Sequence, residues 1–247
     1  MKQADQPSII AFVSDYLPRR CGIATFTHHL RGAVAAEYPD AECAVLAIND
    51  VPEGYDYGQD VQFEIQEHRL RDYQEAVNFL RFNGFDMLCL QHEFGIYGGR
   101  SGSHILAILR EVDLPVVTTL HTILEEPSID QRRVMDEIVR QSERLVVMTE
   151  RGRTILREVH SAPAAKIDLI AHGIPETPFV DPSSLKDQFG VEGKKVLLTF
   201  GLLSPGKGIE YVIQALPEIT RTHPEVMYTC SVRPTLTSCA RRVSVTG

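Results

Sequence analysis

Short apolar runs alternate with amphipathic segments along most of this chain. Six of the apolar runs are continuous rather than alternating in polarity, which is typical of strands buried on both faces of a parallel sheet. Amphipathic segments with a helical period lie between them, and together they predict a doubly wound α/β domain. The predicted strands are 8–14, 41–48, 85–91, 115–120, 144–149 and 166–171, and the predicted helices are 24–37, 70–82, 103–112, 129–141 and 150–159.

The pattern changes after residue 171. Residues 172–184 contain three prolines and one glycine, which favours an extended connector. A predicted strand (194–200), a glycine-rich loop, a helix (209–224) and another strand (225–228) follow. We expect a complete Rossmann-like domain over 1–174 and an incomplete second domain over 175–247, because such a sheet needs about 100 residues to close.

Composition narrows the function classes. The chain has 247 residues, 43% of them hydrophobic and 23% charged, with a formal net charge of −8. An acidic chain without a Lys/Arg block argues against a nucleic-acid partner. No apolar run approaches the ~20 residues of a transmembrane helix, and the N-terminus lacks the features of a secretory signal. Five scattered cysteines without a C-x-x-C motif favour reduced thiols, so we expect a cytoplasmic protein.

Two strand-to-helix connections carry single residues suited to chemistry. Gly22 in PRRCGIATF opens a predicted helix, whose N-terminal N–H groups can meet a phosphate or a hydroxyl. His121 in TTLHT follows a buried strand and can orient a sugar hydroxyl or share a proton near neutral pH. An ordinary turn and a structural histidine explain these two positions equally well.

A polar cluster follows the strand at 85–91, in the segment QHEFGIYGGRSG. Open α/β sheets bind ligands at the carboxyl ends of their strands, and Gln91, His92 and Glu93 lie at such an end. Gly98 and Gly99 allow the following loop to approach a ligand closely. The alternative is a plain glycine-rich connector with a surface His/Glu pair.

The loop GLLSPGKG carries the sharpest signal. Gly201 to Lys207 match the phosphate-binding spacing G-x-x-x-x-G-K, but Gly208 stands where a P-loop needs Ser or Thr to bind Mg²⁺. This mismatch disfavours an NTPase and leaves a phosphate contact from Lys207 without a metal. The chain also lacks G-x-S-x-G, H-E-x-x-H and Asp-x-Asp motifs, which argues against serine hydrolases, zincins and metal-dependent transferases.

Taken in order, six segments resemble the family 4 glycosyltransferases and cover most of residues 8–228. The resemblance implies the GT-B fold, with two Rossmann-like domains. It also implies metal-independent, retaining transfer of a hexose from a nucleotide sugar to a sugar or lipid-linked acceptor, without a cofactor. Peripheral membrane contact is compatible with such an acceptor. The segments are PRRCGIATF, QHEFGIYGG, VVTTLHT, RLVVMTERGRTIL, KIDLIAHGIPE and LLTFGLLSPGKGIEYVIQALPEI.

The resemblance assigns roles to single residues. Gly22 corresponds to the glycine loop near the donor phosphates, and His121 to the histidine beside the reacting sugar. Lys207 corresponds to the lysine that neutralises the leaving diphosphate, where a positive charge stabilises the transition state. His172 and Gly173 match the interdomain H-G-[IV] segment.

The remaining candidates follow from the same resemblance. Gly201 and Gly208 belong to the donor-phosphate loop. Leu202 departs from the family, which usually has an Arg there as a second diphosphate contact, and the later Glu-rich donor motif has no counterpart. The acceptor-side candidates are Gln91, His92, Glu93, Gly98 and Gly99.

The last 19 residues differ in character from the rest. Residues 229–247 contain three Arg, two Cys and no acid, although the chain as a whole has 33 acids. Codons can be chosen so that another reading frame after Tyr228 encodes a loop typical of the family. We hypothesise a one-base slip there, the alternative being a divergent natural C-terminus.

We therefore expect little or no transferase activity from this chain. The second functional hypothesis is a non-catalytic glycan- or protein-binding module.

Overall fold

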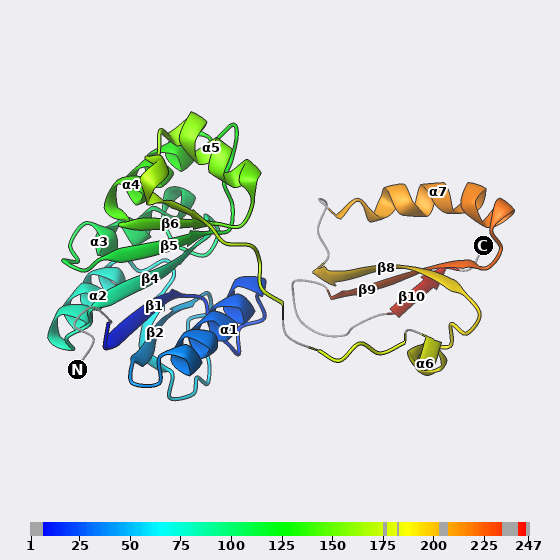
Figure 1. Ribbon diagram of the computed structural model, residues 1–247, viewed down its shortest axis with the longest axis horizontal. Coiled ribbons are helices and arrows are strands. Elements are labelled where there is room, and N and C mark those ends of the chain that lie inside the picture. Colours follow the sequence, from blue (N-terminus) through cyan, green and yellow to red (C-terminus); the bar gives the residue numbers. More distant parts are fainter. Residues whose placement is uncertain (1–6, 175–176, 182, 203–206, 234–241, 246–247) are drawn as a thin grey trace. The chain divides into compact units, whose positions relative to one another are not determined.

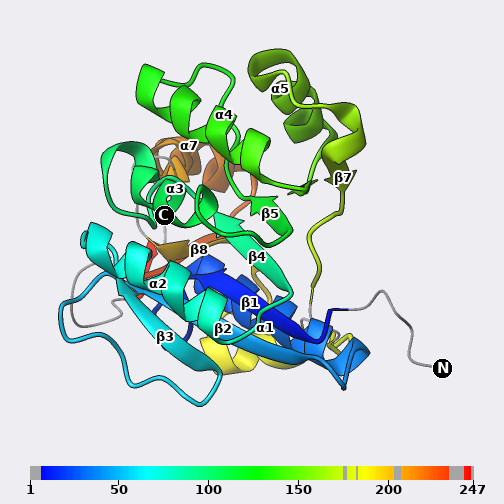
Figure 2. The ribbon, with the colours of Figure 1, turned by 90° about the vertical axis from the view of Figure 1, so that its left-hand side faces the viewer.

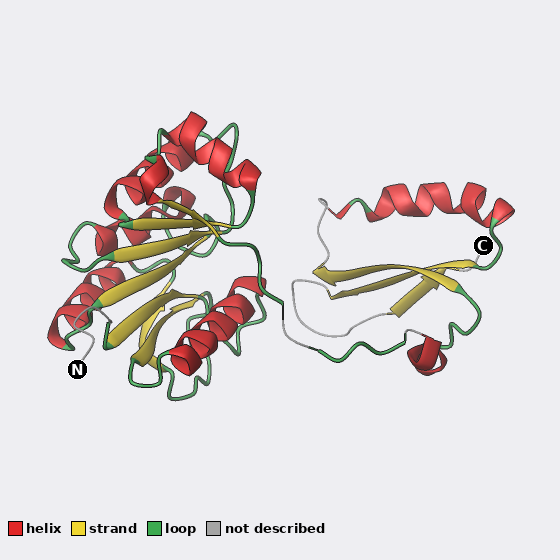
Figure 3. Cartoon of the chain, in the orientation of Figure 1, coloured by secondary structure: helices red, strands yellow, loops and turns green. Residues whose placement is uncertain are grey.

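The structure divides into two compact units. The computed structural model describes residues 7–174, 177–181, 183–202, 207–233 and 242–245. The first unit spans Met1–Gly173 and the second Ile174–Gly247. In both, helices and strands alternate along the chain, as expected for an α/β protein (Figure 3).

Seven strands form one sheet in the first unit (Figure 1). They are β1 (Ile9–Ser14), β2 (Glu42–Asn49), β3 (Val61–Gln66), β4 (Met87–His92), β5 (Val116–Leu120), β6 (Arg144–Val147) and β7 (Ile167–Leu169). Their order across the sheet is β3-β2-β1-β4-β5-β6-β7, and every neighbouring pair is parallel. In this register, Phe12 of β1 lies between Val45 of β2 and Cys89 of β4.

Helices cover both faces of this sheet. They are α1 (Gly22–Glu37), α2 (Leu70–Phe82), η1 (Arg100–Ile105), α3 (Leu106–Leu109), α4 (Ile129–Gln141), α5 (Glu150–His160) and η2 (Ala164–Lys166). α1 packs on one face, where Leu30 and Val34 contact a core cluster that includes Phe12 and Val45. α2, α3 and α4 pack side by side on the opposite face over a larger core, and α5 lies next to α4 (Figure 1, Figure 2).

Side-chain caps define where two of these helices begin. Ser128 and Gln131 form a capping box at α4, in which each side chain accepts a hydrogen bond from the other residue's backbone N–H. Thr149 Oγ1 accepts a hydrogen bond of 3.0 Å from the Gly152 N–H at the start of α5. No helix in the described part of the chain is long and apolar enough to cross a bilayer.

The second unit contains a short sheet and one long helix. The elements are α6 (Ser183–Lys186), η3 (Asp187–Phe189), β8 (Lys195–Leu202), α7 (Ile209–Thr222), β9 (Val226–Arg233) and β10 (Arg242–Val245). β8 and β9, which α7 connects along the chain, pair in parallel, and β10 pairs antiparallel with β9. Leu198 and Phe200 lie two residues apart on β8, and are 57% and 75% exposed.

The six predicted strands of the first unit are confirmed to within two residues at each end. β3 was not predicted, because its polar and apolar residues alternate as they do in an edge strand and only Ile65 is buried. The helix predicted at 103–112 is shorter than expected: residues 103–105 are 3₁₀-helical and follow left-handed Ser101 and Gly102, and α3 ends at Leu109. In the second unit, the strand predicted at 225–228 continues to Arg233.

Candidate active site

Strand order places the candidate site at one edge of the first sheet. The chain builds outward from β1 to β3 on one side and from β4 to β7 on the other, so the order reverses between β1 and β4. In open α/β sheets, ligands bind beyond the carboxyl ends of the strands at this reversal. At this edge β1 ends at Ser14, β4 ends with Gln91 and His92, and β5 ends at Leu120.

Gln91 and His121 form the central contact of this edge. Gln91 Oε1 lies 3.0 Å from His121 Nε2, and an amide oxygen can only accept, so the imidazole donates from Nε2. Burial, and to a smaller extent the neighbouring His172, lower the pKa of His121 to about 4. The ring is therefore neutral at pH 7, and its Nδ1 lone pair can accept a hydrogen bond from a hydroxyl.

Glu93 makes a second contact between the ends of β4 and β5. Thr122 Oγ1 donates a hydrogen bond to Glu93 Oε2, and the Phe94 N–H donates to Glu93 Oε1 at 2.9 Å. Because both carboxylate oxygens are occupied, Glu93 holds the loop after β4 against the loop after β5.

Phe26 of α1 completes the site with two edge-to-face ring contacts. Its ring centroid lies 4.9 Å from that of His121 and 5.1 Å from that of His172. The interplanar angles are 89° and 80°. Sequence analysis identified both histidines but missed Phe26, whose only signal is its place one helical turn after Gly22.

His92 lies beneath the site rather than on its surface. The side chain is fully buried, stacks on Tyr97 and meets Phe94 edge to face. Neither ring nitrogen has a hydrogen-bond partner among the described residues. Burial lowers the pKa of His92 to about 3, so this imidazole is neutral and is enclosed by protein.

Asp15 is a buried acid at this edge that sequence analysis missed. It directly follows β1, and its Oδ1 accepts a hydrogen bond of 2.7 Å from Arg19 Nη1. Burial raises the pKa of Asp15 to about 7, although Arg19 and the Cys21 thiol act in the opposite direction. In the sequence, an acid that follows a strand looks like an exposed loop residue. The only signal that Asp15 could belong to the site was its position directly after the end of β1.

The candidate glycines of the first unit differ in their surroundings. A side chain at Gly22 would meet nothing within 4 Å, so there is open space beside the first residue of α1. Gly173 is similarly unobstructed, and His172 Nδ1 lies 3.5 Å from its carbonyl oxygen. A Cβ at Gly98 would lie 2.0 Å from the Glu67 carbonyl oxygen, and one at Gly99 would lie 2.5 Å from Ser103 Oγ. Close packing of the loop explains these last two glycines without a ligand.

In the second unit, the predicted phosphate-binding residues lie close together. Gly201 has a φ of 121°, which only glycine adopts readily, and Lys207 Nζ lies 4.0 Å from the position of its missing Cβ. Lys207 is exposed, and Gly208 adopts a left-handed conformation immediately before α7. Residues 203–206 of the predicted loop lie outside the described residues.

The described residues include no group of three or more His, Cys, Asp or Glu side chains that could hold a metal ion. Cys21, Cys43, Cys89 and Cys230 are free thiols. The groups that the described residues bring to the edge of the first sheet are imidazoles, amides, carboxyl groups and a helix N-terminus.

Comparisons with known proteins bear on the fold. No protein-family profile matches the chain. Over 129 residues, 45% of this chain and 33% of the relative, it is 26% identical to alpha-D-kanosaminyltransferase of Streptomyces kanamyceticus. Over 43 residues, 17% of this chain and 11% of the relative, it is 44% identical to spore coat protein SA of Bacillus subtilis.

Two solved structures superpose on nearly the whole chain. A glycosyltransferase from Rickettsia africae matches with a TM-score of 0.56 and 13% identity, over 92% of this chain and 60% of that one. The Anabaena protein HepE, in complex with UDP and glucose, matches with a TM-score of 0.53 and 17% identity, over 91% and 61%. The chain has the fold of the GT-B glycosyltransferases.

The chain spans only part of the length of these GT-B proteins. It covers about 60% of the two structures and 33% of the kanosaminyltransferase. Within this GT-B fold, the Gln91–His121 pair lies at the carboxyl edge of the first Rossmann-like unit, beside the N-terminal half of α1.

Proposed function

We propose that this chain contains the acceptor-side domain and part of the donor-side domain of a retaining glycosyltransferase. The enzyme transfers a hexose from a nucleotide sugar to a sugar or lipid-linked acceptor in the cytoplasm, without a metal ion. The observation that carries the proposal is the neutral His121, which Gln91 orients at the strand-order reversal of a GT-B fold.

In the proposed reaction, the bond between C1 of the hexose and the diphosphate oxygen breaks, a bond from C1 to an acceptor hydroxyl oxygen forms, and the proton of that hydroxyl passes to the departing diphosphate oxygen. His121 orients the reacting hexose by accepting a hydrogen bond from one of its hydroxyls at Nδ1. Negative charge develops on the leaving diphosphate, where the N–H groups of α1 near Gly22 supply positive potential. Gln91 keeps the imidazole of His121 in the tautomer that this role requires.

The test uses the full chain with a panel of UDP-, GDP- and ADP-hexoses and short glycan acceptors. Saturation-transfer NMR measures the binding of each ligand, and mass spectrometry with NMR of the anomeric proton measures product formation and its configuration. We expect nucleotide-sugar and glycan binding with slow, chelator-insensitive, retaining transfer. His121→Gln should weaken hexose contacts and lower transfer at least about tenfold, because its amide cannot reproduce the imidazole geometry.

The matched control is His68→Gln, which changes a histidine whose side chain is 83% exposed outside the site. Glycan binding without nucleotide-sugar binding would favour the non-catalytic binding module instead. Mg²⁺-dependent ATP binding that is lost in Lys207→Ala would indicate an NTPase. Failure to bind any of the sugars would rule out the transferase proposal.

A further inference from the structure

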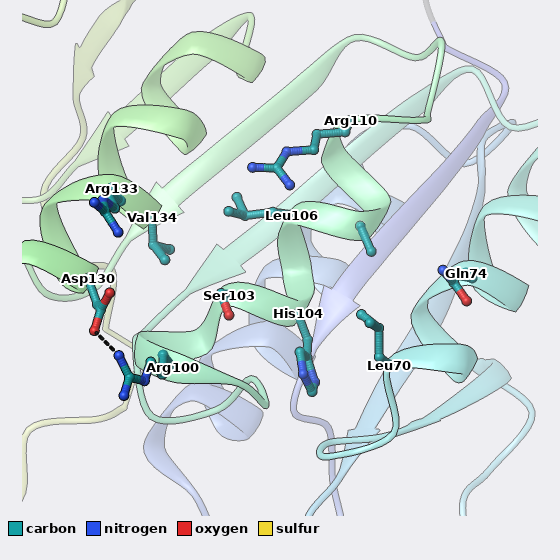
Figure 4. Close-up of a pocket in the computed structure, with 11 residues that line it drawn as sticks. Leu70, Gln74, Arg100, Ser103, His104, Leu106, Arg110, Asp130, Arg133 and Val134 are labelled. Carbon is teal, nitrogen blue, oxygen red and sulfur yellow. Dashed lines mark hydrogen bonds and ion pairs between the residues drawn. The ribbon is translucent and has the colours of Figure 1, made fainter.

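A cavity lies on the helical face of the first unit, away from the Gln91–His121 pair of the candidate active site. It has a volume of about 480 Å³ and is lined by residues of α2, η1, α3 and α4. Figure 4 shows residues of α4 on one side, residues of α2 on the other, and η1 and α3 between them. α3 has only four residues, so it leaves this space open between its longer neighbours.

The lining combines an apolar floor with a basic rim. Leu70, Leu106, Ala107 and Val134 supply the apolar part. Arginines at positions 100, 110 and 133 also line it, with Arg100 and Arg133 on the side of the acid Asp130 (Figure 4). The charged residues of the lining are thus three arginines and one acid, an excess of positive charge on a chain with a net charge of −8.

The charges of this rim are not all neutralised. Arg100 lies 3.5 Å from Asp130 with 87% of its side chain exposed, so this ion pair is weak. Arg110 pairs with Glu137 at 3.2 Å. Arg133 makes no ion pair or hydrogen bond among the described residues, and its guanidinium remains free to bind an anion.

The loop that carries Arg100 and Ser103 into the cavity has a strained backbone. Ser101 has a φ of 51° and Gly102 a φ of 76°, so two consecutive residues are left-handed. A non-glycine residue in this region is strained, and such strain is common at ligand sites. The segment after β4 thus carries Arg100 and Ser103 to the lining of this cavity.

We propose that this cavity binds a soluble organic anion with a phosphate or carboxylate head and a short apolar body. The planar guanidinium groups suit bidentate contact with such a head, and the leucine, alanine and valine side chains suit the apolar body. A cavity of this volume holds a single small molecule. This inference does not depend on the transferase proposal.

Hexyl phosphate is the probe, titrated into the full chain and followed by ¹H–¹⁵N NMR and calorimetry. We expect saturable binding at least about tenfold tighter than that of inorganic phosphate or hexanol, with chemical-shift changes at Leu106 and Ala107. The affinity should fall as salt is added, because the contact is between charges. Arg133→Gln should weaken binding at least about fivefold.

Two further variants separate binding from folding. Arg157→Gln changes an exposed arginine of α5 outside the cavity and should leave the affinity unchanged. Ala107→Leu fills the cavity without removing a charge and should also weaken binding, while circular dichroism checks that both variants are folded.

The proposal is overturned if Arg133→Gln and Arg157→Gln bind hexyl phosphate alike, or if hexyl phosphate binds no better than inorganic phosphate. Binding to vesicles of phosphatidylglycerol without binding to hexyl phosphate would also overturn it, since the ligand would then be a lipid surface.

Discussion

His121 donates a hydrogen bond of 3.0 Å from Nε2 to Gln91 Oε1, which joins the loop after β5 to the end of β4. Gln91 is 1% exposed, and its backbone carbonyl accepts a hydrogen bond of 2.6 Å from the Tyr97 hydroxyl. Tyr97 therefore anchors the backbone at Gln91, while the buried side-chain amide contacts His121 and sets the tautomer of the histidine.

Gln91→Glu should raise the pKa of His121 from about 4 to its ordinary value or above. A carboxylate at this distance stabilises the imidazolium, whereas the amide cannot. Histidine resonances followed by NMR across pH 3–9 measure the change. The resonances of His160, which pairs with Asp136 outside the site, serve as the internal reference. An unchanged His121 titration would show that the contact with Gln91 does not form in solution.

Phe26→Ala should also raise the pKa of His121, because the ring of Phe26 contributes to the burial that keeps the imidazole neutral. The same substitution removes the contact with His172 and should lower any transferase activity. Phe82→Ala is the matched control, since Phe82 is 87% exposed at the end of α2. If both variants leave the His121 titration unchanged, Phe26 has no part in setting it.

Hydrophobic patterning predicted the framework of the first unit because continuous apolar runs separate buried parallel strands from amphipathic helices. The same reasoning placed Gln91 and His121 at strand ends. It could not reveal that β4 and β5 are neighbours, which brings the two side chains within hydrogen-bonding distance. Phe26 was missed because its partners are about 95 and 146 residues away in the chain.

The pattern of apolar and polar residues also could not predict the backbone conformation of the loop after β4. The apolar residues of 3₁₀-helical and α-helical turns recur with a similar period. The left-handed conformation of Ser101 depends on tertiary packing, which the period of apolar residues does not predict. Likewise, nothing in the pattern separates an exposed His92 from one enclosed by Phe94 and Tyr97.

His92→Leu should make the first unit less sensitive to acid. In the folded chain His92 stays neutral down to about pH 3, whereas in the unfolded chain it takes up a proton near pH 6.5. Between these values the unfolded state binds more protons, so stability rises with pH and is lost on acidification. Removing the imidazole should reduce that loss by about 1.4 kcal/mol per pH unit between pH 4 and 6, measured by urea unfolding.

Asp15→Asn should change the pH dependence of stability in the direction opposite to His92→Leu. The Asp15 carboxyl keeps its proton in the folded chain up to about pH 7, so the folded state binds the extra proton between pH 3.8 and 7. Its contribution to stability therefore falls as the pH rises through this window. The variant should show a steeper acid loss than the parent chain, whereas His92→Leu shows a shallower one. Parallel curves for all three proteins would contradict both assignments.

Gly98→Ala should destabilise the chain by about 2 kcal/mol or more, a value typical of overpacking. The added Cβ would lie 2.0 Å from the Glu67 carbonyl oxygen and 2.6 Å from His104 Nδ1, so the loop must move. Gly95→Ala is the control in the same loop, because a Cβ there meets nothing within 4 Å. Equal thermal midpoints for the two variants would show that the loop packs differently in solution.

Leu198 and Phe200 of β8 carry a practical consequence for anyone who handles this chain. Large apolar side chains so exposed at alternate positions of one strand favour contact with other molecules as the concentration rises. Yield, shelf life and apparent molecular mass should therefore depend on dilution.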